Sequence, residues 1–131
     1  MDETGAAQNE AIAEIADPVR VEKARLRTAM AERLEALTDE TRRAASAAAT
    51  ARLERLPVFA AARRVFTCLS FGRELDTWPL VDALLARGRE VFVPRADRAD
   101  GRLHVHRYPC PLTTLAFGLR QPRKTEAEIP W

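Results

Sequence analysis

We predict an α/β protein with a mainly parallel sheet, preceded by an N-terminal helical hairpin, from two features of the sequence. Residues 18–56 carry apolar side chains at helical spacing, between residues that start and end helices. Residues 64–94 follow as strand, helix and strand, which is the pattern of a βαβ unit with parallel strands. The length of 131 residues is that of one domain, and a hydrophobic content of 47% is enough to build a core.

The domain organisation follows from the charge pattern. Residues 1–17 carry five acidic and no basic residues and lack the features of secretory or mitochondrial targeting, so we expect a flexible acidic leader. Residues 18–131 then form a single α/β domain with 21 basic against 14 acidic residues, a formal charge of +7. That charge suits a nucleotide, a polyglutamate-like substrate or nucleic acid, whereas compositional drift toward Arg and Ala is the alternative interpretation.

Two helices are expected at the start of the domain. Asp17 and Pro18 have the N-cap and first-turn chemistry of a helix start. Thr38 caps a second helix, which continues to about Leu56 and is stopped by Pro57. The first helix has an apolar stripe that we expect to face the core, formed by Val19, Leu26, Met30, Leu34 and Leu37.

The strands are expected after Arg64. "RVFTCLSF" and "EVFVP" are buried strands, and the helix "WPLVDALLAR" between them ends at Gly88. "RLHVHRYP" alternates like a half-exposed third strand, and the chain from Pro109 onward is loop-like. Cys68 should be a small buried side chain within the first strand. Because Cys68 and Cys110 give neither a disulfide framework nor metal spacing, a reducing, cytoplasmic location is expected.

Glu74 is the first candidate for a ligand contact. It lies in the loop after the first strand, and ligands of open α/β sheets bind beyond the carboxyl ends of strands. Asp76 or Thr77 is better explained as the N-cap of the next helix. Glu74 comes too early to cap that helix, so a ligand contact explains it best.

Two further pairs have functional spacing. Lys23 and Arg27 share a helix face and can grip phosphate oxygens, unless they belong to a solvated face paired with Glu22 or Glu32. His104 and His106 share a strand face at a spacing that metal sites use. No third ligand stands nearby in the sequence, so the two histidines are expected to face solvent.

The motifs in this order resemble the 5-formyltetrahydrofolate cyclo-ligase family, also called 5,10-methenyltetrahydrofolate synthetases, over about residues 20–123. The matching stretches are "KARLR", "VFTCLSFGRELDT", "LLARGREVFVPR", "LHVHRY" and "FGLRQP". The resemblance implies a three-layer α/β/α fold and an ATP- and Mg²⁺-dependent ligase that turns 5-formyltetrahydrofolate into 5,10-methenyltetrahydrofolate. The expected enzyme is a monomer that binds no nucleic acid and no membrane.

The resemblance also implies roles for individual residues. Lys23 and Arg27 would contact the ATP phosphates. Leu69 would line the folate pocket, Glu74 would hydrogen-bond the pterin, and Phe117 would form a wall beside it. It assigns no catalytic residue and no metal ligand.

The sequence departs from the family in three places. Gln121 stands where the family often has Glu, and Leu103 where Met is common. The family continues into a Gly-rich loop ending in Tyr-Tyr-Asp, so the C-terminal part of the family fold is expected to be missing. Turnover would then be impaired, because backbone donors for phosphoryl transfer would be lost.

Two alternatives remain open. The chain can be a family remnant that binds nucleotide or folate without catalysis. It can instead be a basic helical hairpin that binds nucleic acid, for which the candidate residues are Arg20, Arg25, Arg42 and Arg43.

Overall fold

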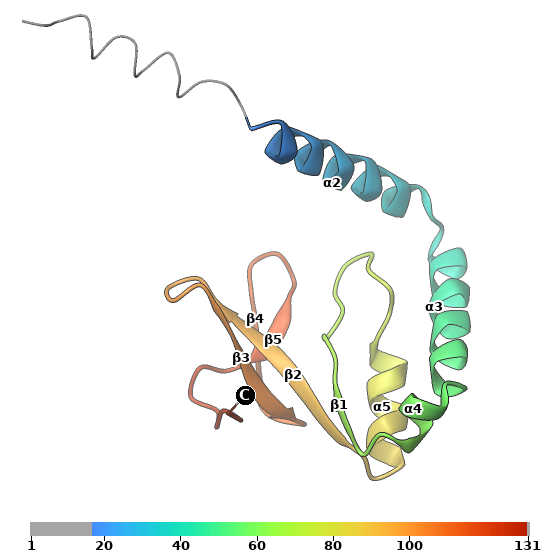
Figure 1. The fold of residues 1–131 in the computed structure, drawn as a ribbon, viewed down its shortest axis with the longest axis vertical. Coiled ribbons are helices and arrows are strands. Elements are labelled where there is room, and N and C mark those ends of the chain that lie inside the picture. The colour runs from blue at the N-terminus through green and yellow to red at the C-terminus, as the bar shows by residue number, and fades with distance from the viewer. Residues whose placement is uncertain (1–16, 131) are drawn as a thin grey trace, which may run out of the picture. The chain divides into compact units, whose positions relative to one another are not determined.

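A computed structural model describes residues 17–130, and the chain divides into two compact units, Met1–Ala36 and Leu37–Trp131 (Figure 1). The expected leader, residues 1–17, lies outside the described residues except for Asp17. The expected single domain over residues 18–131 stays a prediction. No helix in the described residues is long and apolar enough to cross a membrane.

The first unit is described as helix α2, Pro18–Ala36. The carboxylate of Asp17 accepts a hydrogen bond from the Val19 amide at 3.0 Å, which confirms the predicted helix start. Val19 is 59% exposed and α2 has no buried residue, so the expectation that its apolar stripe faces a core stays a prediction. The described part of this unit is one helix, so it contains no second element to cover that face. The helical hairpin stays a prediction, because α2 and α3 belong to different units.

The second unit begins with helix α3, Asp39–Glu54, and the short helix α4, Pro57–Ala61. The Thr38 hydroxyl accepts a hydrogen bond from the Thr41 amide at 3.1 Å, which confirms the predicted cap. Pro57 does more than end α3, because it also opens α4 as a first-turn proline.

A three-stranded sheet follows, in the order β1 (Arg64–Phe66), β2 (Glu90–Asp97) and β3 (Arg102–Tyr108). Helix α5, Trp78–Ala86, connects β1 to β2, and these two strands are parallel, as predicted. β1 is shorter than the predicted buried strand, and the prediction for Cys68 is wrong, because it lies after the end of β1 and is exposed. β3 is antiparallel to β2, since the turn between them, with Gly101 at φ 68°, is too short for a parallel crossover. The sheet is therefore mixed, and the prediction of a mainly parallel sheet is corrected for the described residues.

The segment after Pro109 contains a two-stranded antiparallel sheet, β4 (Leu112–Thr114) and β5 (Arg120–Pro122), so the expected loop there is wrong. Gly118, at φ 95°, donates its amide to the Leu115 carbonyl in the turn between these strands. The prolines did not prevent this sheet, because Pro111 lies before β4 and Pro122 closes β5.

The hydrophobic core lies between α5 and one face of the sheet. Its buried side chains are Leu69, Leu80, Val81, Leu84, Val91 and Val93. Burying a side chain of this size stabilises a fold by roughly 1.5–3 kcal/mol relative to leaving it in water. This layer fixes the start of α5 and the end of β1, and it thereby fixes the loop between them.

Candidate functional site

The loop from Thr67 to Thr77 begins where β1 ends and is closed by reciprocal hydrogen bonds. The Ser70 amide donates to the Thr77 hydroxyl at 3.0 Å, and the Thr77 amide donates to the Ser70 hydroxyl at 2.9 Å. The Thr77 hydroxyl also donates to the Cys68 carbonyl at 2.7 Å. Thr77 occupies the N-cap position of α5, but its side chain closes the loop and does not cap the helix. The Asp76 carboxylate, one residue earlier, accepts the first-turn amide of Trp78 at 3.1 Å.

Glu74 lies at the outer part of this loop and is exposed. Its carboxylate oxygen Oε2 accepts the Phe71 amide at 3.1 Å, and its own amide donates to the Phe71 carbonyl at 3.3 Å. Gly72 supplies the positive φ of 59° that this turn requires. Glu74 thus stabilises its own turn. This structural role was not predicted from the sequence, because Glu74 was considered there only as a possible cap of the next helix or as a ligand contact. A carboxylate has acceptor capacity beyond one such bond, so a ligand contact stays compatible with this role.

Two aromatic rings connect the loop to the β4–β5 turn. The ring centroids of Phe71 and Phe117 lie 5.7 Å apart at an interplanar angle of 60°. Phe117 is 54% exposed and so presents ring surface to solvent beside the Glu74 loop. Leu69 is only 4% exposed and belongs to the core beneath the loop. The ligand roles of Leu69, Glu74 and Phe117 stay predictions.

A cavity of about 450 Å³ lies between the carboxyl end of β2 and the β4–β5 turn. Phe117 lines it together with charged and polar side chains, among them Arg95, Asp97, Gln121 and Lys124. The Gln121 amide is fixed by hydrogen bonds to both backbone groups of Ala96, at 3.0 and 3.2 Å. The backbone of β2 therefore holds the Gln121 side chain in place. The cavity as a whole combines an aromatic wall with both positively and negatively charged side chains.

Arg95, which lines this cavity and is only 4% exposed, is the centre of an ion-pair network. Its guanidinium donates to Asp97 at 3.1 Å, to Glu128 at 3.2 Å and to the His106 ring at 3.3 Å. The Ala99 amide and then the Arg95 guanidinium lower the pKa of Asp97. The sequence did not predict this network, because Glu128 lies 33 residues from Arg95.

The two histidines do not face solvent as expected. His106 is fully buried, and its Nδ1 lies 3.0 Å from the Ala127 carbonyl. His104 lies 3.0 Å from Glu128 and 2.7 Å from Asp100, and these two carboxylates raise its pKa. The expectation of a solvent-facing pair is corrected, because the segment around Glu128 bridges to β3 and covers the rings.

Among the described residues, three side chains near the end of β2 and the start of β3 form a candidate cation site. One ligand atom from each of Asp97, Asp100 and His104 lies within 4.8 Å of the others. Asp97 already pairs with Arg95 and with Lys124, the latter at 3.6 Å, so its charge is balanced by the protein. This trio does not fit Mg²⁺, which prefers oxygen ligands with uncompensated charge and water.

Lys23 and Arg27 lie on α2, four residues apart and both exposed. Glu22, one of the predicted alternative partners, pairs instead with Arg25 at 2.6 Å, and this hydrogen bond lowers the pKa of Glu22. Within the described residues neither Lys23 nor Arg27 forms an ion pair. They belong to a different unit from Glu74, so their predicted convergence on one cleft stays a prediction.

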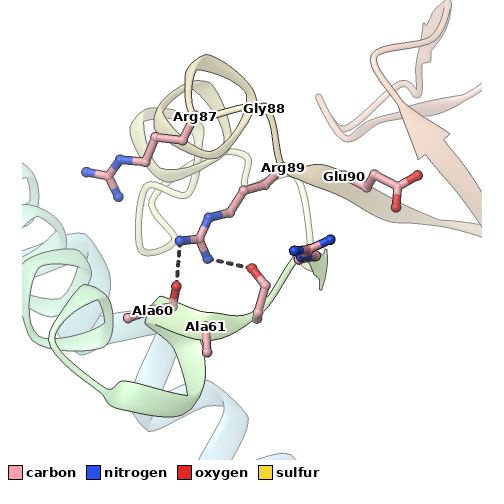
Figure 2. A pocket seen from close by; sticks show the side chains of 8 residues that line it. Ala60, Ala61, Arg87, Gly88, Arg89 and Glu90 are labelled. Carbon is pink, nitrogen blue, oxygen red and sulfur yellow. Dashed lines mark hydrogen bonds between the residues drawn. The ribbon is translucent and has the colours of Figure 1, made fainter.

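A second cavity, of about 580 Å³, lies at the opposite end of the sheet, where β1 and β2 begin. The Arg89 side chain donates to two carbonyls at the end of α4, that of Ala60 at 2.6 Å and that of Ala62 at 2.5 Å. Figure 2 shows Arg89 pointing toward Ala60. Arg87 pairs with Glu54 at 3.0 Å. Arginines near a helix C-terminus commonly satisfy its last carbonyls, so this cavity has a structural explanation.

The sequence profile of the 5-formyltetrahydrofolate cyclo-ligase family matches residues 19–129. The chain belongs to this family, as the resemblance of its motifs predicted.

A solved structure supports the same assignment. The NMR structure of Aquifex aeolicus 5,10-methenyltetrahydrofolate synthetase is similar to this chain, with 25% identity and a TM-score of 0.66. The match covers 82% of this chain and 54% of that protein, so the chain spans about half the length of this relative. No curated protein matches the sequence.

Proposed function

We propose that the chain binds 5-formyltetrahydrofolate at the carboxyl end of the sheet and supports its ATP-dependent conversion to 5,10-methenyltetrahydrofolate. The observation that supports this most is the Glu74 carboxylate, held by its own turn beside the Phe71–Phe117 ring pair. A pterin is a flat heterocycle with an edge of N–H donors. It therefore suits a carboxylate next to an exposed aromatic ring.

The reaction begins with an unreactive formyl group, because the lone pair of N5 is delocalised into the carbonyl. Transfer of the γ-phosphoryl group of ATP to the formyl oxygen turns that oxygen into a leaving group and releases ADP. N10 then attacks the formyl carbon and loses its proton, phosphate leaves and takes up a proton, and the 5,10-methenyl bridge results. The protein contributes position and charge neutralisation to these steps.

The residues have separate tasks in this proposal. Glu74 accepts from the pterin edge, Phe117 covers one pterin face, and Leu69 supports the pocket from the core. Lys23 and Arg27 hold phosphate oxygens, Lys as a point charge and Arg as a fork. Mg²⁺ bound with ATP would offset the charge of the phosphates, and we assign no residue of this chain as its ligand.

The finer features of the prediction belong to this proposal as well. They are a three-layer α/β/α arrangement, a monomer and a cytosolic location, the last in keeping with the free thiols of Cys68 and Cys110. A chain that binds nucleotide or folate without turnover stays the second candidate. For the nucleic-acid alternative, Arg25 is already paired with Glu22, and Arg42 contacts the Glu74 carbonyl.

The first prediction concerns Glu74 and is tested by calorimetric titration of 5-formyltetrahydrofolate into the chain. Glu74→Gln should weaken binding roughly tenfold or more, because hydrogen bonds to a charged group contribute about 1.5–3 kcal/mol. Glu90→Gln is the matched control at the opposite end of the sheet, where Glu90 pairs with exposed Arg64, and should leave the affinity unchanged.

The same samples with MgATP separate the two candidates. A rise in methenyl-folate absorbance with ADP release supports the ligase, and binding without absorbance change supports the binding protein. Equal affinity of wild type and Glu74→Gln, or no binding by wild type, contradicts the proposed site.

A further inference from the structure

One face of α3 contacts the Glu74 loop at three positions. Asp39, Arg42 and Ser46 are spaced three and four residues apart, so they share this face. The contacts are Arg73 Nη1 to Asp39 Oδ1 at 3.4 Å, Arg42 Nη1 to the Glu74 carbonyl at 3.4 Å, and the Asp76 amide to Ser46 Oγ at 2.9 Å. The helix thus contacts the residue before Glu74, Glu74 itself, and the second residue after it.

Ser46 is the best-defined of these contacts. It is the one buried residue of α3, at 4% exposure, and it is a single hydroxyl within the run "AASAAA". An alanine would pack there equally well, but the Asp76 amide would then lose its acceptor. The Ser46 hydroxyl is therefore explained by its hydrogen bond to the loop, and not by a need of helix α3.

The presence of an arginine at position 42 is also best explained by its contact with the Glu74 loop, for a different reason. Its Nε atom is buried and has no hydrogen-bond partner among the described residues. A buried donor without a partner lowers stability, so folding alone gives no reason for a guanidinium here. The contact that Arg42 does make is with the backbone of Glu74.

We propose that the Arg42–Ser46 face of α3 positions the Glu74 carboxylate for its ligand, and that Arg42 and Ser46 are positioning residues. The inference rests on the proposed function of Glu74. The Phe71 amide fixes the carboxylate within its turn, while Ser70 and Thr77 close the base of the loop. The α3 face supplies the remaining support by holding the outer part of the loop against a helix. A side chain held in its binding geometry loses less conformational freedom when the ligand arrives.

The test is a double-mutant cycle on 5-formyltetrahydrofolate affinity, measured by calorimetry on the full chain. Arg42→Ala and Ser46→Ala should each weaken binding roughly tenfold, an effect equal to about 1.4 kcal/mol. In a Glu74→Gln background the same substitutions should have less than a twofold effect, because they act through Glu74. Ser46→Thr restores the hydroxyl and should recover most of the affinity.

Arg43→Ala is the matched control, since Arg43 lies next to Arg42 but donates to the Asp39 carbonyl within α3. It should bind like wild type. Circular dichroism at the assay temperature selects folded variants, and hydrogen exchange of the 71–76 amides reports loop order without ligand. Faster exchange in Arg42→Ala and Ser46→Ala, but not in Arg43→Ala, supports the positioning role.

The outcomes separate the two proposals. If wild type binds and Glu74→Gln does not, yet the α3 variants bind like wild type, the positioning role is wrong and the proposed function stands. Equal losses in the wild-type and Glu74→Gln backgrounds also overturn it, because the α3 residues would then act independently of Glu74. Absence of binding by wild type overturns the proposed function and this inference with it.

Discussion

His104 lies between the carboxylates of Glu128 and Asp100. The charge of its imidazole therefore affects how firmly the C-terminal segment around Glu128 is held. Its Nδ1 is 3.0 Å from Glu128, and its Nε2 is 2.7 Å from Asp100. Glu128 also accepts from Arg95, and the Ile129 amide donates to the Val105 carbonyl at 2.8 Å. A protonated imidazole therefore helps to hold the segment around Glu128 against β3.

The stability of the protein should consequently decrease as the pH rises through the pKa of His104. Glu128 and then Asp100 raise this pKa above the ordinary value of about 6.5, and the pKa values of both carboxyls are lowered, so they stay ionised there. A histidine whose pKa is higher in the folded state than in the unfolded state stabilises the fold fully at pH values below its unfolded-state pKa. This stabilisation is lost as the pH rises through its folded-state pKa.

Urea unfolding at pH values from about 6 to 8.5 measures this effect, since the range begins below the ordinary histidine pKa and extends above it. Wild type should lose unfolding free energy across the range, and His104→Asn should show a flatter profile. An NMR titration of the imidazole gives the pKa directly. A wild-type profile as flat as that of the variant would contradict the role of His104.

At the scale of elements, α3 depends on its first turn. The Thr38 hydroxyl satisfies the Thr41 amide, and Asp39 and Glu40 place negative charge at the positive end of the helix. Thr38→Ala should lower the free energy of unfolding by about 1 kcal/mol, as N-cap substitutions do. Thr50→Ala, in the last turns of the same helix, is the control and should change stability little. Thermal and urea unfolding of both variants provide the comparison, and equal stability of the two would contradict the cap.

The helices and the first strands could be predicted because their signals are local. The caps at Asp17 and Thr38, and the strand–helix–strand order around Leu84, each depend on residues near one another in the sequence. The β4–β5 pair was missed, since prolines at strand ends look like loop residues until the pairing partner is known. β3 is antiparallel to β2 because the turn at Asp100-Gly101 is short. This turn is visible in the sequence, but the prediction of a mainly parallel sheet did not take it into account.

The residues of the candidate site could be proposed from the sequence only where they lie in one short motif, and their ligand roles stay predictions. Glu74 was a candidate from its place in the loop after the first strand, and Phe117 came from the family resemblance alone. The loop that holds Glu74 lies in a single stretch of sequence. The support from Ser46 is 30 residues away from Asp76, and the Glu128 contact with Arg95 spans 33 residues. One signal for this support was present in the sequence. A single serine in an alanine-rich helix can indicate that its hydroxyl bonds a segment packed against the helix.

For the whole molecule, stability should depend on the layer between α5 and the sheet more than on any surface contact. Leu84 is 1% exposed and packs with Val91 and Val93 across this layer. Leu84→Ala removes buried apolar atoms and leaves a cavity, so it should lower the free energy of unfolding by about 2–5 kcal/mol. Leu103→Ala is the matched control, because Leu103 is 53% exposed on β3, and it should change the free energy by less than about 0.5 kcal/mol.

Urea unfolding followed by tryptophan fluorescence measures both variants. Trp78 is a suitable reporter, since its indole N–H donates to the Ser70 carbonyl at 2.9 Å and its ring contacts Tyr108 at the edge of the core. The loop that carries Glu74 is attached to this layer through Leu69 and the start of α5. Leu84→Ala should therefore also weaken folate binding when part of the protein is unfolded. A similar small effect of both leucine substitutions would show that the α5 layer does not hold the unit together.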